Sequence, residues 1–267
     1  MFDKVLFPLG LNESRLQVTR LADILSRFSA REVLLFHADS GSGKGARVRA
    51  RLQSYQKLLE SYPFHTDIHH APGADARTII HTAETHGMNS ICFSWKRKAP
   101  IQRLLLGSTT QDVVRQSPLP VFVYKKSGDS GHKSLSAILY ATTLKQDDSS
   151  RLTSRNLKAG SLILLHVGTR APDPRAEAER EQQVQDQLND LQQQCQSAFH
   201  QVKTISAVGR PSRRILQHAK AESADMIILG KHEAASPLLK MLGSTAEQVA
   251  HRSRCSILIL PPAGGVV

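Results

Sequence analysis

The sequence has few aromatic residues, few cysteines and no long hydrophobic run. Aromatic side chains make up only 5% of the 267 residues, so a stacking surface for single-stranded nucleic acid is not expected. The three cysteines, Cys92, Cys195 and Cys255, have no paired spacing, and Cys92 and Cys255 lie within apolar runs. This usage indicates buried free thiols in a reducing compartment rather than a disulfide framework.

Signals for membranes and for known chemistry are also missing from the sequence. No segment approaches the roughly 18 apolar residues of a membrane-spanning helix. The first residues lack the basic and long apolar segments of a signal peptide, so we expect a cytoplasmic protein. No nucleophile, base and acid appear in a known catalytic spacing, and no cysteine and histidine spacing suits a metal. We therefore expect no catalytic residues, no metal site and no contact with a membrane.

The chain is strongly basic, with a formal net charge of +12. This charge suits a solvated basic surface, and it could also attract phosphates or other polyanions. No motif that reads DNA or RNA is present, so we do not expect nucleic acid as a partner. Binding of a polyanion through charge alone stays open as a hypothesis, and its affinity should fall steeply with salt.

The most informative feature is an internal duplication. A segment that begins at Ala71 reads APGADARTIIHTAETHGMNSICFS, and one that begins at Ala207 reads AVGRPSRRILQHAKAESADMIILG. The shift of 136 residues places Gly73 on Gly209 and needs no gap as far as the later Leu-Gly-Ser-Thr sequences. A repeat of this length is a domain, not a solenoid unit. We predict two domains, residues 1–126 and 134–263, joined by the small polar residues between them.

Each half alternates strand and helix patterns. The first half predicts strands at residues 4–9, 33–38, 65–70, 90–93 and 120–124, with helices at 13–28, 46–61, 74–86 and 108–116. The second half predicts strands at 137–142, 162–167, 202–207, 226–229 and 256–260, with helices at 176–199, 212–222 and 244–251 and a weak helix at 145–157. Strands separated by helices favour an α/β fold with two tandem, doubly wound, parallel five-stranded sheets. Ligands would bind at the carboxyl ends of the strands.

Several polar residues near those strand ends have two interpretations. His37 and His166 end the second strand of each half, as packing residues or, less favoured, as bases. A cluster of histidines occurs at 65, 69 and 70, but neighbours on a strand point to opposite faces, which argues against a metal site. The pair Arg213 and Arg214 is interpreted as a solvated helix start, with contact to a ligand phosphate as the alternative.

The segments 101–124 and 226–260 resemble the universal stress protein family. The nucleotide-binding branch of that family has the pattern G-x2-G-x9-G-[ST] after the fourth strand, followed by a helix. In the second half the matching residues are Gly230, Gly243 and Ser244, followed by Thr245, while Glu233 replaces the middle glycine. In the first half Ser94 and Arg97 stand at the first two glycine positions, and Gly107 and Ser108 match the final pair.

The resemblance implies an adenine nucleotide alpha hydrolase-like fold and leaves the role of this loop open. The structural interpretation, which we favour, is a tight turn at Gly107 and Gly243 with Ser108 and Ser244 as helix N-caps. The alternative is binding of ATP or another adenine nucleotide at Gly230, Gly243, Ser244 and Thr245. A carboxylate at Glu233 would repel phosphate. The family's aspartate at the end of the first strand is also missing, because Gly10 and Thr143 occupy those positions.

The function implied by the resemblance is a stress or regulatory protein that acts through protein partners rather than by catalysis. The alternative is a nucleotide-binding switch or weak ATPase that uses the second loop. Because family members commonly pair their last strands across a two-fold axis, we expect residues 121–124 to lie against residues 257–260 in an intramolecular pseudo-dimer. A further homodimer is compatible with the sequence.

Overall fold

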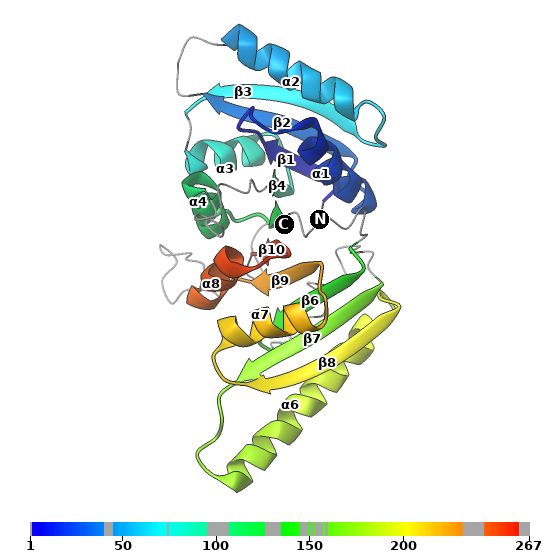
Figure 1. The fold of residues 1–267 in the computed structure, drawn as a ribbon, viewed down its shortest axis with the longest axis vertical. Coiled ribbons are helices and arrows are strands. Elements are labelled where there is room, and N and C mark those ends of the chain that lie inside the picture. The colour runs from blue at the N-terminus through cyan, green and yellow to red at the C-terminus, as the bar shows by residue number, and fades with distance from the viewer. Residues whose placement is uncertain are drawn as a thin grey trace. The chain divides into compact units, whose positions relative to one another are not determined.

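The computed structural model describes residues 2–39, 45–73, 75–94, 107–125, 135–144, 149, 152, 157, 160–231 and 243–261. The chain divides between Lys125 and Lys126 into two compact units, each with its own sheet and helices (Figure 1). Unit 1 is the amino-terminal one, and unit 2 is the carboxy-terminal one. The predicted linker at 126–133 lies outside the described residues, as does most of the weak helix predicted at 145–157.

Unit 1 contains a five-stranded parallel sheet of order β3-β2-β1-β4-β5. Its strands are β1 (Lys4–Pro8), β2 (Glu32–Asp39), β3 (His65–Pro72), β4 (Ser90–Ser94) and β5 (Val121–Tyr124). Its helices are α1 (Arg15–Arg27), α2 (Gly45–Leu59), α3 (Ala76–Thr85) and α4 (Ser108–Gln116). The strand order reverses after β3, which is the arrangement of a doubly wound sheet.

Unit 2 repeats this topology with the order β10-β9-β6-β7-β8, and its strands are also parallel. Its strands are β6 (Ala137–Thr142), β7 (Ser161–Gly168), β8 (Gln201–Val208), β9 (Met226–Gly230) and β10 (Ser256–Leu260). Its described helices are α6 (Pro174–Cys195), α7 (Pro211–Ala221) and α8 (Ser244–Arg252). The predicted fold class of two tandem doubly wound sheets is therefore confirmed.

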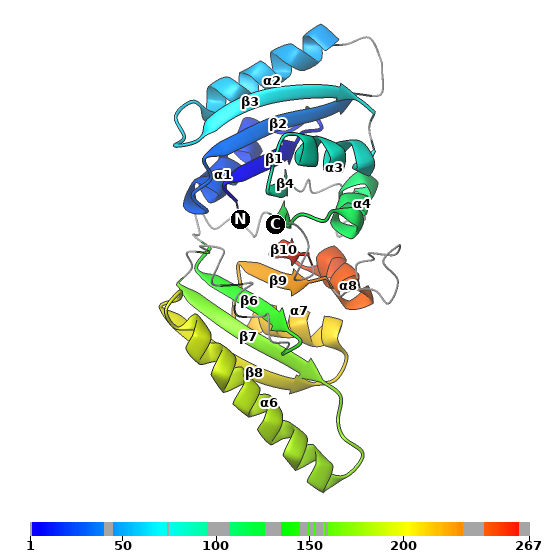
Figure 2. The ribbon, with the colours of Figure 1, turned by 180° about the vertical axis from the view of Figure 1, so that it is seen from behind.

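Helices pack against the sheet of each unit because their apolar residues form one stripe. In unit 1, α1 lies beside α2, and α3 lies beside α4; in unit 2, α7 lies beside α8 (Figures 1 and 2). The stripe predicted for the long Gln-rich helix is confirmed, since α6 buries Val184, Leu188, Leu191 and Cys195. This helix begins at Pro174 because Asp173 caps it, its carboxylate accepting bonds from two first-turn amides.

Side chains tie the backbone together at the same places in both units. Gln56 donates to the carbonyl of Thr66 at 2.6 Å, and the equivalent Gln192 donates to Val202 at the same distance. Before the last strand of each unit, the Ser117 and Ser253 hydroxyls bridge the turn in the same way. The duplication therefore extends from the strand order down to individual hydrogen bonds.

All three cysteines are buried free thiols, as the sequence predicted. Burial raises the pKa of the Cys92 thiol well above its ordinary value, because the thiolate would lose its hydration. A thiol held in its neutral form is a poor nucleophile and a poor metal ligand. Cys92 therefore acts as a small apolar residue of the unit 1 sheet.

Candidate functional site

The turn after the first strand has the same unusual backbone in both units. Leu11 follows β1 with φ of 62°, and Leu144 follows β6 at the equivalent position with φ of 60°. A leucine in the left-handed region is strained by roughly 1 kcal/mol, because its Cβ crowds the backbone. Strain that is kept at both copies of one turn marks the carboxyl end of the first strand as a constrained place in this fold.

Unit 1 places a buried carboxylate in this turn. Glu13 is 5% exposed, and its Oε1 accepts from the amide of Gly10 at 3.1 Å. The backbone carbonyl of Glu13 accepts from the Tyr55 hydroxyl at 2.7 Å and from Arg51 at 3.2 Å. Burial and the Glu13 carboxylate raise the pKa of Tyr55. Glu13 was not predicted as a site residue, although the capping box at Ser14 and Gln17 places it in the loop just before α1.

The two strand-end histidines hold the first and second strands together. Nδ1–H of His37 donates to the carbonyl of Leu9 at 2.7 Å, and Nδ1–H of His166 donates to that of Thr142 at 3.2 Å. Leu9 and Thr142 are equivalent positions, so the bond is repeated in both units. Burial lowers the pKa of His166 despite this bond, and the charge of Arg180 lowers it further. The bond from Nδ1–H gives each histidine the packing role that the sequence predicted.

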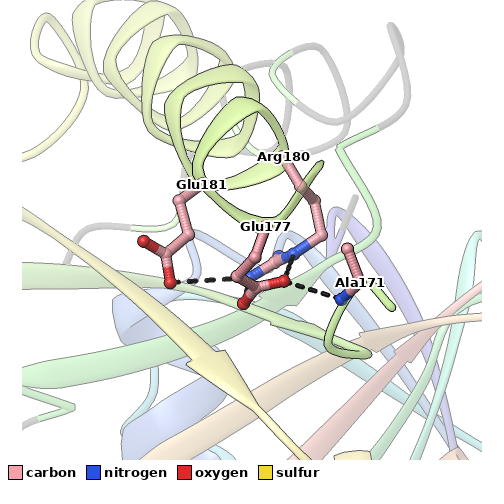
Figure 3. Close-up of polar contacts among 4 residues, drawn as sticks. All are labelled: Ala171, Glu177, Arg180 and Glu181. Carbon is pink, nitrogen blue, oxygen red and sulfur yellow. Dashed lines mark hydrogen bonds and ion pairs between the residues drawn. The ribbon is translucent and has the colours of Figure 1, made fainter. Parts of the chain in front are cut away.

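Unit 2 covers the end of β7 with an ion pair on the helix that follows (Figure 3). The Glu177 carboxylate accepts from Nε of Arg180 at 2.9 Å, from its Nη2 at 2.8 Å and from the amide of Ala171 at 2.7 Å. Glu181 lies 4.0 Å from the same Nη2. The bonds from Arg180 and Ala171 lower the pKa of Glu177 to about 2. The ion pair therefore persists through the physiological pH range and anchors the loop after β7 to α6.

Arg180 packs closely on the strand end, so a side chain at Gly168 would make it shift. A Cβ on Gly168 would lie 3.1 Å from Nη1 of Arg180 and 3.4 Å from Nε2 of His166. Nη1 is buried and has no hydrogen-bond acceptor among the residues that the structure describes. Sequence reasoning missed this cluster, because an arginine in a polar helix has the pattern of a solvated residue. The side chains of Arg180, Glu177 and His166 therefore cover the end of β7.

The residues predicted at the glycine-rich loop lie at the expected strand and helix ends. Ser94 and Gly230 are the last residues of β4 and β9. The hydroxyl of Ser94 is buried without a hydrogen-bond partner in the described part of the chain. Arg97 and Glu233 lie outside the described residues.

The predicted N-cap roles of Ser108 and Ser244 are wrong. Gly107 and Gly243 are the N-caps, since their carbonyls already accept the first helical bonds, from Gln111 and Glu247. The serines are the first residues of α4 and α8, and Thr245 is the second of α8.

The predicted tight turn at these glycines also does not require glycine. The φ and ψ angles are −58° and 149° at Gly107, and −60° and 148° at Gly243, which any residue adopts. A Cβ on Gly107 would meet no heavy atom of the described residues within 4 Å. Neither helix has a side-chain cap, so the first-turn amides of α4 and α8 lack the acceptor that Asp75 supplies to α3.

The start of α7 is the predicted solvated helix start, with one arginine engaged. Arg214 donates to the carbonyl of Val208 at 2.9 Å and lies against Gly209, whose φ is 131°. Arg213 is exposed, and the N-cap is Arg210, which makes no side-chain cap bond. The aligned glycine of unit 1, Gly73, also has a positive φ, of 97°.

The histidines of β3 face both sides of the sheet, as predicted. His69 stacks on Phe36 and approaches His86, with ring centroids 4.5 Å apart, whereas His70 stacks on His37. No group of three or more potential metal-ligating side chains is found in the described ranges. Among the described residues, no helix is long and apolar enough to span a bilayer.

Known structures share this fold over nearly the whole chain. A universal stress protein from Archaeoglobus fulgidus superposes with a TM-score of 0.72 at 19% identity, covering 99% of this chain and 98% of its own. A functionally unknown protein from Pseudomonas aeruginosa PAO1 superposes with a TM-score of 0.69 at 16% identity, covering 97% and 92%. At such low sequence identities, the similarity to these structures is evidence of a shared fold alone.

Sequence comparisons identify the family. The universal stress protein YxiE of Bacillus subtilis is 37% identical over 60 residues, which are 22% of this chain and 40% of that protein. The chain thus spans less than half the length of this relative. The sequence model of the universal stress protein family matches residues 1–125 and 152–261, which is most of both units. The resemblance seen in the sequence is confirmed: the chain belongs to the universal stress protein family and carries two copies of its domain in tandem.

Proposed function

We propose that the chain is a cytoplasmic regulatory protein of the stress response that acts through protein partners and has no catalytic site of its own. One observation carries this proposal: the polar groups at the strand ends are bonded to other groups of the chain itself. Nδ1–H of His37 and of His166 donates to a carbonyl group, and Glu177 accepts two hydrogen bonds from Arg180 and one from the amide of Ala171. A carboxylate so engaged is a poor base, because protonation would require breaking those bonds.

A turnover assay tests this proposal directly. Purified protein is incubated with ATP or GTP, and release of phosphate is measured with wild type and with His166→Gln. The expected result is no release above the buffer rate for either protein. Turnover that persists through purification and disappears in His166→Gln would contradict the proposal. Cell fractionation tests the cytoplasmic location.

A nucleotide-binding switch, with weak ATPase activity as its extreme form, is the second candidate. The supporting observation is that Gly243 and Gly107 are glycines where neither backbone angles nor, at Gly107, neighbouring atoms demand one. Uncapped amides at a helix start favour an anion such as a phosphate. The two copies differ, because Glu247 places a carboxylate in the first turn of α8 and α4 has none. This charge difference favours phosphate at Gly107 and Ser108 over Gly230, Gly243, Ser244 and Thr245.

Paired valine substitutions decide between the two copies. Gly243→Val and Gly107→Val each add a side chain where the backbone tolerates it, so both variants should fold. Native mass spectrometry of gently purified protein, followed by calorimetric titration with ATP, measures nucleotide binding. Loss of binding in one variant locates the site in that unit. If ATP binds and both variants keep full affinity, the site lies elsewhere.

We also propose the pseudo-dimer that the family resemblance implies, with residues 121–124 against residues 257–260. The supporting observation is that the sequences VFVY and SILIL are apolar strands, each at one end of its own unit's strand order. An apolar strand with an open edge is prone to aggregation unless it is covered. Hydrogen exchange on monomeric protein tests this: slow exchange is expected along both strands, and rapid exchange in either would contradict it.

A further inference from the structure

The helices α2 and α6 are equivalent in the two units but opposite in charge. Each follows the second strand and buries four residues at the same spacing: Val48, Leu52, Tyr55 and Leu59 in α2, and Val184, Leu188, Leu191 and Cys195 in α6. Over its 15 residues α2 carries Arg47, Arg49, Arg51 and Lys57 and no acidic residue. In contrast, α6 carries five carboxylates and two arginines. Packing on the sheet is therefore compatible with either charge.

Local stability does not explain Arg47 and Arg49. Arg47 lies in the first turn of α2, where the helix dipole disfavours a positive charge. Arg47 and Arg51 are four residues apart, a spacing at which like charges repel. No acidic residue stands three or four positions from Arg47 or Arg49, and residues 40–44 contain none. In α6, by contrast, Glu177 suits the dipole and Arg175 pairs with Glu179 at 3.2 Å.

The cationic side chains of α2 are of two kinds: three extend into solvent, and one is held in place by hydrogen bonds. Arg47, Arg49 and Lys57 are exposed, and the described residues provide no ion pair to either arginine. Arg51 is held in place: its guanidinium donates to the Tyr55 hydroxyl at 3.0 Å and to the Glu13 carbonyl at 3.2 Å. It also lies 4.7 Å from the centre of the Tyr55 ring. The surface thus combines one positioned arginine with three accessible cations.

The chemistry of this surface matches a row of phosphates. The guanidinium group bonds two phosphate oxygens at once, which ammonium cannot do with the same geometry. Arg47 and Lys57 are separated by about 15 Å along the helix axis, a distance that spans several charges of a duplex. The apolar stripe of α2 is buried in its own unit and Leu58 is half-buried, so α2 offers little apolar surface to insert into a bilayer. Few aromatic residues are present to stack on unpaired bases.

We propose that the exposed side of α2, with Arg47 and Arg51 on one flank, Arg49 on the other and Lys57 between them, binds the phosphate backbone of double-stranded nucleic acid without sequence preference. This goes beyond a general effect of the net charge, because it assigns the contact to one helix of unit 1. Recognition of the backbone needs no base-reading motif, so it agrees with the absence of one from the sequence. Its affinity depends on release of counterions and therefore on salt.

The test compares two variants with the same change in net charge. Arg47→Glu/Arg49→Glu alters α2, and Arg252→Glu/Arg254→Glu alters two exposed arginines of unit 2. Fluorescence anisotropy with a duplex of about 25 base pairs is recorded from about 50 to about 200 mM salt. For the α2 variant we expect affinity to fall more than about tenfold and the slope of log K against log salt to shrink by about 2. The unit 2 variant should lose less than about threefold.

Folding and the alternative partner are controlled in the same experiment. Because glutamate suits the start of a helix, the α2 variant should unfold at the same temperature as wild type or a higher one, so lost binding cannot be attributed to unfolding. Equal losses in both variants, or no binding of wild type at the lowest salt, would overturn the proposal. Binding of anionic phosphatidylserine vesicles through α2, without duplex binding, would overturn it in favour of a membrane surface.

Discussion

The two units differ most at the carboxyl ends of their strands, where a ligand would bind. They differ least in the hydrogen bonds that join their strands and helices. Both use a histidine to join the first two strands, a glutamine to join helix and strand, and a positive φ at the first turn. At the carboxyl ends of the strands, however, unit 1 buries the carboxylate of Glu13, whereas unit 2 covers β7 with Arg180 and Glu177. The two copies thus share these hydrogen bonds to the backbone, whereas the side chains at the carboxyl ends of their strands differ.

This comparison shows why a role cannot be transferred from one unit to the other. Asp39 ends β2 where Gly168 ends β7, and a Cβ on Gly168 would lie 3.1 Å from Arg180. The start of α3 is capped by Asp75, whereas α7 begins one residue earlier in the aligned repeat and has Arg210 at its N-cap. Any ligand of this protein should therefore be specific to one unit.

The strongest challenge to the shared scaffold is a pair of core truncations. Leu52→Ala and Leu188→Ala remove equivalent buried side chains, which are 1% and 0% exposed. Each should lower the free energy of unfolding of its own unit by about 2–5 kcal/mol, because the cavity adds to the lost burial. Hydrogen-exchange mass spectrometry in urea reports the two units separately. Leu16→Ala, at a position 55% exposed, serves as the control and should change little. A large loss in only one unit would show that the cores have diverged.

Substitutions at the N-caps of α3 and α7 sharpen the comparison. Asp75→Ala removes the carboxylate that bonds the amide of Thr78 at 2.8 Å and should lower the stability of unit 1. Arg210→Asp supplies a cap to α7 and removes an unfavourable charge, so it should stabilise unit 2 by about 0.5–1 kcal/mol. Chemical denaturation measures both effects. Arg210→Ala separates the two contributions, since it removes the charge without adding a cap. If Arg210→Asp destabilises the protein, the arginine has a structural role that α7 needs.

The smallest expected difference concerns acid stability. Burial lowers the pKa of His69 in unit 1 and of His166 in unit 2 from the ordinary value of 6.5. A base whose pKa is lower in the folded state binds fewer protons there than in the unfolded chain. Its contribution to stability is present above pH 6.5 and is lost as the pH falls below that value. Unfolding midpoints at pH 7.5 and 5 should therefore decrease less in His166→Gln than in wild type. The same pH dependence in the variant would assign the effect to other groups.

Much of the fold could be predicted because its signals are local. Alternating apolar runs and helical stripes are set by residues near one another in sequence, and the shift of 136 residues exposed the duplication. The predicted N-caps were wrong by one residue. Ser108 and Ser244 are residue types that often cap helices, but they lie just inside α4 and α8. Glu13 and Arg180 were missed, because their partners belong to other turns and strands. The pairing of residues 121–124 with residues 257–260 stays a prediction.

The sequence by itself determined the family, the fold class and the repetition of one domain, since periodic burial and turn residues suffice to specify them. Only the tertiary structure decided which groups at the strand ends are already engaged. His37 reaches a carbonyl 28 residues away, and Arg180 rests on a strand that ends before its own helix begins. Such contacts depend on how the chain folds back on itself, and residue spacing carries little record of that geometry.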